Sequence, residues 1–125
     1  MTSSTLRIAG VVSVLCLFVG MAAVTGAREP AKTKVTIHAE AGGFFGYVHS
    51  PKQDPCELNR KVKLYKQRGS EQNRRVDKKI GTDVAQPNGP DSQWNINTNK
   101  SGKFYAFTKR VAGCKGDYSK TVHSE

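Results

Sequence analysis

From residue 34 onward, hydrophobic and polar residues alternate in short runs that end at turn-forming residues. Val35 and Ile37 alternate with charged and polar neighbours, as do Val62 and Leu64 further along. A period of two residues is typical of a β-strand with one buried face, because successive side chains point to opposite faces. The pattern predicts strands over 34–40, 44–49, 61–66, 78–85, 94–98, 103–111 and 118–123.

The runs are separated by sequences that favour turns. Ser50-Pro51 ends the second run, and Asn88-Gly89 lies in a segment dense in turn formers between the fourth and fifth runs. No helical periodicity longer than one turn is present in this region. About seven short strands, with turns at intervals of about a dozen residues, predict an all-β fold, an antiparallel β-sandwich.

Residues 1–27 have the layout of a secretory signal peptide. Arg7 precedes an apolar run from 8 to 24, and small residues close the run. We therefore expect a signal peptide over 1–27, a flexible connector over 28–33 and the β-sandwich domain over 34–125, in a protein that is secreted or held at the cell surface. The apolar run has about 17 residues, near the roughly 20 that span a bilayer. The alternative is therefore a protein anchored in the membrane by an uncleaved leader.

The cysteines are consistent with export. Cys16 lies inside the apolar run, which leaves Cys56 and Cys114 in the remainder of the chain. An even number of cysteines in an oxidising compartment favours a disulfide. Closing a loop of about 60 residues stabilises the folded state by about 4 kcal/mol on chain-entropy reasoning. The alternative is a pair of free, buried thiols.

Several motifs of the predicted strands occur in an order that resembles a known group of domains. They are Phe44-x-Gly46-x-Val48-x-Ser50, Cys56, Arg60-x-Val62-x-Leu64-Tyr65, Ile80-Gly-Thr-Asp83, an Asn-Gly turn before Trp94, Gly102-Lys-Phe-Tyr-Ala106, Cys114 and Ser119-x-Thr121-Val122. From about residue 33 to residue 122, the chain resembles bacterial secreted β-sandwiches of the transthyretin-like and carboxypeptidase-regulatory-like (immunoglobulin-like) groups. The resemblance implies the same sandwich fold as the alternation.

For function, the resemblance implies an accessory role. Such sandwiches serve as stalks, adhesive modules, regulatory appendages and carbohydrate-binding units. One transthyretin-like branch is an enzyme that hydrolyses a cyclic urate product and ends in Tyr-Arg-Gly-Ser. Residues 121–125 of this chain are Thr-Val-His-Ser-Glu and lack that tail. The resemblance therefore does not extend to that activity.

Residues that could carry chemistry are scattered along the chain. The histidines are His38, His49 and His123. None has a second ligand at a metal-binding spacing, and no nucleophile-elbow sequence is present. Asp83, Asn88 and Asp91 could offer oxygen atoms to calcium, but they lack the order of a helix-loop-helix site and suit turn capping. We expect no enzyme, no metal and no cofactor, with a small secreted hydrolase as the less favoured alternative.

Positive charge is the strongest signal outside the predicted core. The chain has 20 Lys and Arg against 10 Asp and Glu, a net charge of +10. Between residues 60 and 79, the only acidic residues are Glu71 and Asp77. The basic residues there are Arg60, Lys61, Lys63, Lys66, Arg68, Arg74, Arg75, Lys78 and Lys79. If the two strands of this region pair, their outward residues form one basic face that can attract a polyanion.

We therefore expect a non-enzymatic exported module with a structural or binding role and no membrane span after the leader. The alternative is an effector that binds a polyanion through the basic face: a wall polymer, an acidic glycan or an anionic lipid. Export and the lack of interleaved aromatic residues argue against nucleic acid as the partner. Contact with another surface protein stays open, and so does a purely solvated face, because Lys on exposed strands also blocks edge-to-edge aggregation.

Overall fold

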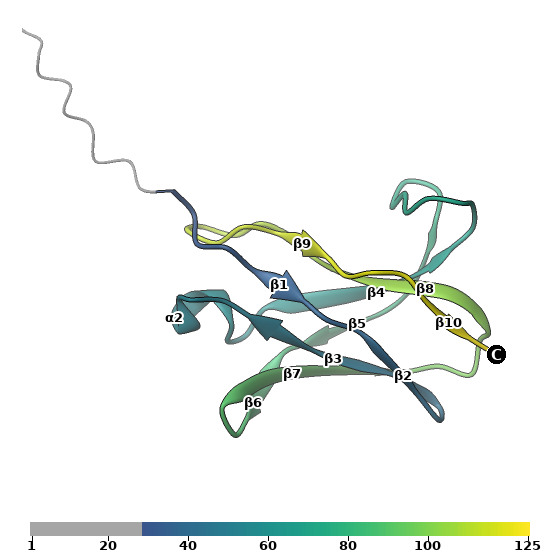
Figure 1. Ribbon diagram of the computed structural model, residues 1–125, viewed down its shortest axis with the longest axis horizontal. Helices are drawn as coiled ribbons and strands as arrows, with labels where there is room; N and C mark the ends of the chain where they lie inside the picture. The colour runs from purple at the N-terminus through teal and green to yellow at the C-terminus, as the bar shows by residue number, and fades with distance from the viewer. Residues whose placement is uncertain (1–28) are drawn as a thin grey trace, which may run out of the picture.

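The computed structural model describes residues 29–125, whose strands form two packed antiparallel sheets of five strands each (Figure 1). The first sheet contains β1 (Lys34–Val35), β2 (His38–Glu40), β3 (Gly43–His49), β6 (Gln86–Asn88) and β7 (Asp91–Asn97). The second sheet contains β4 (Lys61–Gln67), β5 (Lys78–Val84), β8 (Gly102–Thr108), β9 (Asp117–Tyr118) and β10 (Val122–Ser124). The expected all-β sandwich is confirmed. The predicted signal peptide and Cys16 lie outside the described residues.

The strand order determines which side chains become neighbours. The first sheet runs β1-β3-β7-β6, with β2 also paired to β3. The second sheet runs β10-β8-β4-β5, with β9 also paired to β8. A short helical turn, α2 (Gln53–Cys56), lies between β3 and β4 at one end of the sandwich (Figure 1). Strand β4 therefore has a neighbour on each side, and its outward residues lie between those of β5 and β8.

The core lies between the two sheets and includes Val62 and Leu64, which the alternation placed inward. Phe44 of β3, Trp94 of β7 and Phe104 of β8 are almost fully buried, as are Val62 and Leu64 of β4. The rings of Phe44 and Phe104 join the two sheets, with 4.6 Å between their centroids. Full burial of a large apolar side chain contributes about 1.5–3 kcal/mol, so this core is the main source of stability.

The segment predicted as one strand over 34–40 is two strands, interrupted at Thr36. The Thr36 carbonyl lies over β3 and accepts a hydrogen bond from the Trp94 indole N–H at 3.1 Å. The Tyr47 N–H bonds to the Thr36 hydroxyl oxygen instead, at 2.9 Å. Gly46 lies directly beneath, where a Cβ would be 1.9 Å from the Thr36 oxygen. The buried indole thus obtains its partner because Gly46 allows the close approach.

Two other predicted segments differ from the expectation. The run 118–123 is divided into β9 and β10 by a bulge at Ser119. The Ser119 N–H donates to the Ala106 carbonyl at 2.8 Å, and the Ser119 hydroxyl accepts the Ala106 N–H at the same distance. The predicted turn over 86–91 is a hairpin in which Asn88 pairs with Asp91. The Ser119 hydroxyl completes the backbone pairing with β8, so the alternation in the sequence did not show the break.

The start of the domain is fastened at the end that carries the disulfide. Cys56 and Cys114 are bonded, with 5.4 Å between their Cα atoms, so the predicted disulfide is confirmed. The Ala31 N–H donates to the Gly113 carbonyl, and the Ala31 carbonyl accepts from the Lys115 N–H. Thr33 is buried. Within the connector predicted over 28–33, the backbone at Ala31 therefore pairs with the segment around Cys114.

Candidate polyanion-binding surface

The 68–77 loop connects β4 to β5 and folds over the outer face of the second sheet (Figure 1). Asp77 holds the loop in place and is only 8% exposed. Its Oδ1 accepts the Arg68 N–H at 2.9 Å, and its Oδ2 accepts the Asn73 N–H at 2.7 Å. The same Oδ2 accepts the hydroxyl of Tyr105, in β8, at 2.6 Å. One carboxylate therefore shapes the loop and also attaches it to the sheet.

Burial and hydrogen bonding act in opposite directions on Asp77. Burial disfavours its charged form, but the bonds from Tyr105 and two backbone N–H groups, together with the Arg68 charge, bring its pKa below the usual value. Burial and the neighbouring carboxylate raise the pKa of Tyr105. At neutral pH the carboxylate is an anion and the phenol is a neutral donor, as their hydrogen bond requires.

Beneath the loop lies an aromatic cluster separate from the core. Tyr65 stacks on Tyr105, with 5.5 Å between ring centroids, and Phe107 packs against Tyr118 at 4.5 Å. The Arg74 guanidinium carbon lies 3.8 Å from the Phe107 ring centroid, and its Nε–H donates to the Tyr118 hydroxyl at 2.6 Å. That hydrogen bond raises the pKa of Arg74. The loop thus places a fixed cation on the outer face of the second sheet.

Four lysines lie on the same face as this arginine. Lys61 and Lys63 alternate with inward residues of β4, and Lys79 of β5 lies beside Tyr65. Burial lowers the pKa of Lys63, and the charges of Lys79, Lys109, Lys61 and Arg74 lower it further. These four charged neighbours of Lys63 are all cations. We call Lys61, Lys63, Arg74, Lys79 and Lys109 the basic surface.

The acidic side chains of the domain do not neutralise these cations. Within residues 29–125, no hydrogen bond joins a Lys or Arg side chain to a carboxylate. Glu57, Asp83 and Asp117 instead each accept a backbone N–H at 2.8 Å, and Asp77 accepts two. These four carboxylates hold loops and strands, and the charge of the basic surface is left to solvent or to a ligand.

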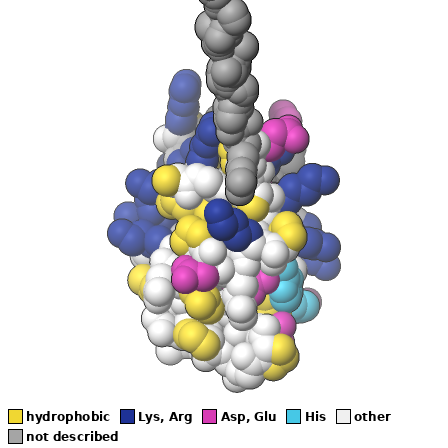
Figure 2. Space-filling model, turned by 90° about the vertical axis from the view of Figure 1, so that its left-hand side faces the viewer, with side chains coloured by type: hydrophobic (Ala, Val, Ile, Leu, Met, Phe, Trp, Pro, Cys, Tyr) yellow, Lys and Arg dark blue, Asp and Glu magenta, His cyan; other side chains and the backbone are white. Residues whose placement is uncertain are grey.

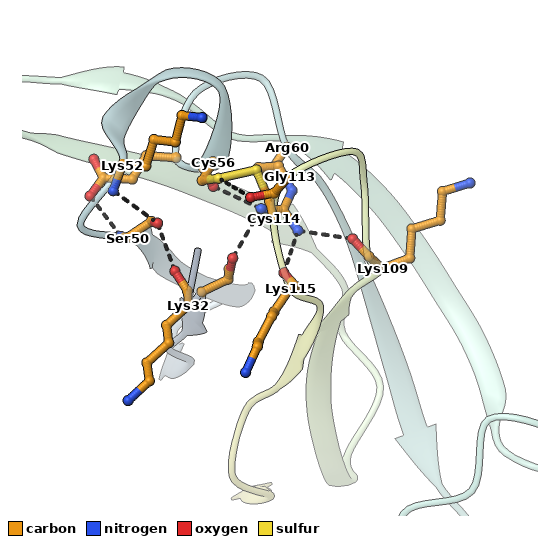
Figure 3. The surroundings of a disulfide bond; sticks show 11 residues. Lys32, Ser50, Lys52, Cys56, Arg60, Lys109, Gly113, Cys114 and Lys115 are labelled. Carbon is orange, nitrogen blue, oxygen red and sulfur yellow. Dashed lines mark hydrogen bonds between the residues drawn. A yellow bond between two sulfur atoms is a disulfide. The ribbon is translucent and has the colours of Figure 1, made fainter. Parts of the chain in front are cut away.

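Arg60 is a correction to the predicted set, because it is buried, with 3% of its surface exposed. Figure 3 shows its guanidinium beside the disulfide, where it donates to the carbonyls of Cys56, Lys109 and Lys115 at 2.8–3.0 Å. It also donates to the Thr33 hydroxyl. Burial lowers its pKa. Arg60 is two residues before Val62, so the alternation that placed Val62 inward also pointed Arg60 inward.

The other predicted basic residues lie around the edge of the basic surface. Lys66 and Lys78 are paired across β4 and β5, at the end of these strands that leads into the loop. Arg68 and Arg75 are exposed within the loop. Sequence reasoning missed Lys109, which is two residues beyond the outward Phe107 and follows the same alternation. Figure 2, an end-on view, shows Lys and Arg side chains on both flanks of the upper half of the molecule.

Within residues 29–125, the three histidines lie apart from any cluster of acidic groups or cysteines. His38 and His49 lie on the outer face of the first sheet, in a row with Phe45 and Tyr47, and His123 is on β10. Within the described part of the chain, no group of three or more His, Cys, Asp or Glu could hold a metal ion. The carboxylate of Asp83, one of the possible calcium ligands, accepts the Asn95 N–H.

Comparisons with known proteins add no identification. No protein-family model and no curated protein matches the sequence. Among solved structures, a hypothetical protein from Pyrococcus horikoshii OT3 is similar at 16% sequence identity, with a TM-score of 0.38, over 78% of this chain and 90% of that chain. A similarity of this size supports no argument. Between residues 29 and 125, none of the helical structure is long and apolar enough to cross a membrane.

Proposed function

We propose that this β-sandwich is a non-enzymatic exported module that binds an anionic polymer at or beyond the cell surface. The observation that carries the proposal is the basic surface, in which five cations from four segments lie on one face and, among residues 29–125, donate to no carboxylate. Adjacent like charges raise the free energy of the folded state, and a bound polyanion relieves that cost. The arrangement therefore favours a ligand with several negative groups.

The anionic polymer is defined by its chemistry. Wall polymers, acidic glycans and anionic lipid headgroups all present closely spaced negative groups. Binding of such a polymer releases counterions and weakens as the salt concentration rises. Nucleic acid is the less favoured partner because the sequence predicts export.

The use of the reactive side chains supports a binding role over an enzymatic one. Cys56 and Cys114 are joined to each other, and the buried carboxylate of Asp77 is fully engaged with three donors. Hydrolysis through a covalent serine or cysteine intermediate needs a nucleophile paired with a general base. On the basic surface, lysines and one arginine surround aromatic rings, an arrangement suited to holding negative charge.

Retention on immobilised heparin, an available polyanion, tests the proposal. The variant is Lys61→Gln, Lys63→Gln, Lys79→Gln. With about 0.2–1 kcal/mol for each exposed charge contact, we expect about a tenfold loss of affinity at moderate salt. The salt dependence of binding should become shallower, since fewer counterions are released.

A matched control removes the same charge elsewhere. It is Lys32→Gln, Lys52→Gln, Lys100→Gln, at exposed positions outside the basic surface. We expect its affinity for heparin to change less than about twofold, because this variant lowers only the net charge of the protein, which acts weakly at long range in salt. Equal losses in the two triple variants would show that net charge alone drives retention, and would overturn the proposal.

A further inference from the structure

A hollow of about 410 Å³ opens between the 68–77 loop and β9, next to the basic surface. It is lined by Gln72, Asn73, Arg74, Arg75 and Tyr118. The Tyr118 side chain is 43% exposed, although it packs on Phe107. The hollow therefore combines two arginines, two amides and one accessible aromatic ring.

Arg74 is held in a defined orientation at this hollow. Its guanidinium stacks on Phe107, and its Nε–H is bonded to the Tyr118 hydroxyl. Among the described residues, no carboxylate accepts a hydrogen bond from either of its Nη groups. A guanidinium fixed in this way keeps its planar edge ready for an anion, with little entropy left to lose on binding.

The amides beside Arg74 differ in what they can offer. Gln72 is already used, because its Nε2 donates to the Ser119 carbonyl and the Thr121 hydroxyl at 2.9 Å. The Asn73 Oδ1 accepts the Arg75 N–H at 3.0 Å, which orients the Asn73 amide. The Asn73 Nδ2 donates to none of the residues 29–125. It is a placed donor for a neutral oxygen of a ligand.

We infer that this hollow binds a uronic-acid residue of an acidic polysaccharide, with the carboxylate on Arg74, a hydroxyl on Asn73 and the apolar face of the sugar ring against Tyr118. The inference rests on the proposed function and names the polymer that the basic surface receives. A carboxylate is planar and matches the guanidinium edge with two parallel hydrogen bonds. The lysines of the basic surface then meet carboxylates further along the same chain.

The aromatic ring distinguishes a uronate from a phosphate polymer. A pyranose ring exposes C–H groups on its face, and these pack on an aromatic side chain, whereas a glycerol phosphate chain has no such face. A bidentate carboxylate contact also requires the guanidinium, since a lysine ammonium is a point charge without the fork. Exchange of Arg74 for lysine should therefore discriminate between the two polymers.

Titration calorimetry of the protein with trigalacturonate, and in a second arm with poly(glycerol phosphate), tests the inference. For Arg74→Lys we expect about a tenfold loss of affinity for trigalacturonate, the cost of one charge-assisted contact, with less than about a twofold change for poly(glycerol phosphate). Arg110→Lys is the matched control at an exposed arginine outside the hollow, and should change neither affinity. Thermal melting of each variant checks that the fold is kept.

Tyr118→Phe gives a second variant that keeps the ring and removes the hydroxyl that orients Arg74. We expect about a threefold loss for trigalacturonate, smaller than for Arg74→Lys because the stacking on Phe107 is kept. Equal effects of Arg74→Lys on both ligands, or no effect on either, would overturn the uronate site. The basic surface would stand in that case, provided that the triple lysine variant still loses binding to both polymers. If the unaltered protein binds neither polymer nor heparin, both proposals fall.

Discussion

Arg60 and Arg74 flank the same strand, β4, and are used in opposite ways. Arg60 is buried beside the disulfide and donates to three backbone carbonyls and one hydroxyl. Arg74 is exposed on the outer face, where it stacks on Phe107 and donates to Tyr118. Burial lowers the pKa of Arg60, and the tyrosine hydrogen bond raises the pKa of Arg74.

The difference shows that the partners of a charge indicate its role better than the charge itself. The four oxygen partners of Arg60 come from separate segments, so this side chain joins the disulfide turn to the ends of the second sheet. The partners of Arg74 hold its orientation without neutralising it. A buried cation whose terminal N–H groups donate to its own protein stabilises the fold, whereas one held in place with donors left for solvent is available to a ligand.

The largest expected effect is at the disulfide end. Replacing Cys56 and Cys114 by serine should lower the free energy of unfolding by about 4 kcal/mol, because the unfolded chain regains the entropy of a loop of about 60 residues. Urea denaturation at neutral pH measures the change. Polyanion binding by the remaining folded protein should persist, since the partners of Arg74 lie outside the disulfide turn. Loss of binding in protein that is still folded would contradict the separation of the two regions.

Exchanging each arginine for methionine compares them directly. Arg60→Met leaves the carbonyls of Cys56, Lys109 and Lys115 without donors, and we expect a loss of about 3 kcal/mol in the free energy of unfolding. Arg74→Met removes an exposed contact with Phe107 and should cost no more than about 1 kcal/mol. Urea denaturation of both variants, side by side, gives the two values. Equal losses would mean that Arg74 is as structural as Arg60.

Asp77→Asn should have a smaller effect that depends on pH. At pH 7 we expect a loss of about 2 kcal/mol, because the amide cannot accept from all three donors that the carboxylate satisfies. The pKa of Asp77 is below its usual value, so its contribution is complete above about pH 4 and is lost as the pH falls through the lowered value. Urea denaturation at pH 7 and pH 3 should show the difference between the proteins shrinking in acid. An equal difference at both pH values would show that the charged form of Asp77 is not the source of its contribution to stability.

Much of the candidate site followed from local pattern. The alternation placed Lys61 and Lys63 on the outward face of β4, and the pairing of β4 with β5 places Lys79 beside them. Arg60 was assigned wrongly because its charge outweighed its position in the alternation. Lys109 was missed because it is distant in sequence, and only the pairing of β4 with β8 brings the end of β8 to this face.

The all-β class, inward residues such as Phe44 and Leu64, and the Cys56–Cys114 disulfide could be predicted from the sequence, because these depend on a period of two residues and on cysteine number. The use of the polar groups follows from how the two sheets fold together. The bond from Trp94 to Thr36, the attachment of Asp77 to Tyr105 and the opposite roles of Arg60 and Arg74 all join residues far apart in the chain. Hydrogen bonds depend on distance and direction in space, and neither is fixed until the sheets pack.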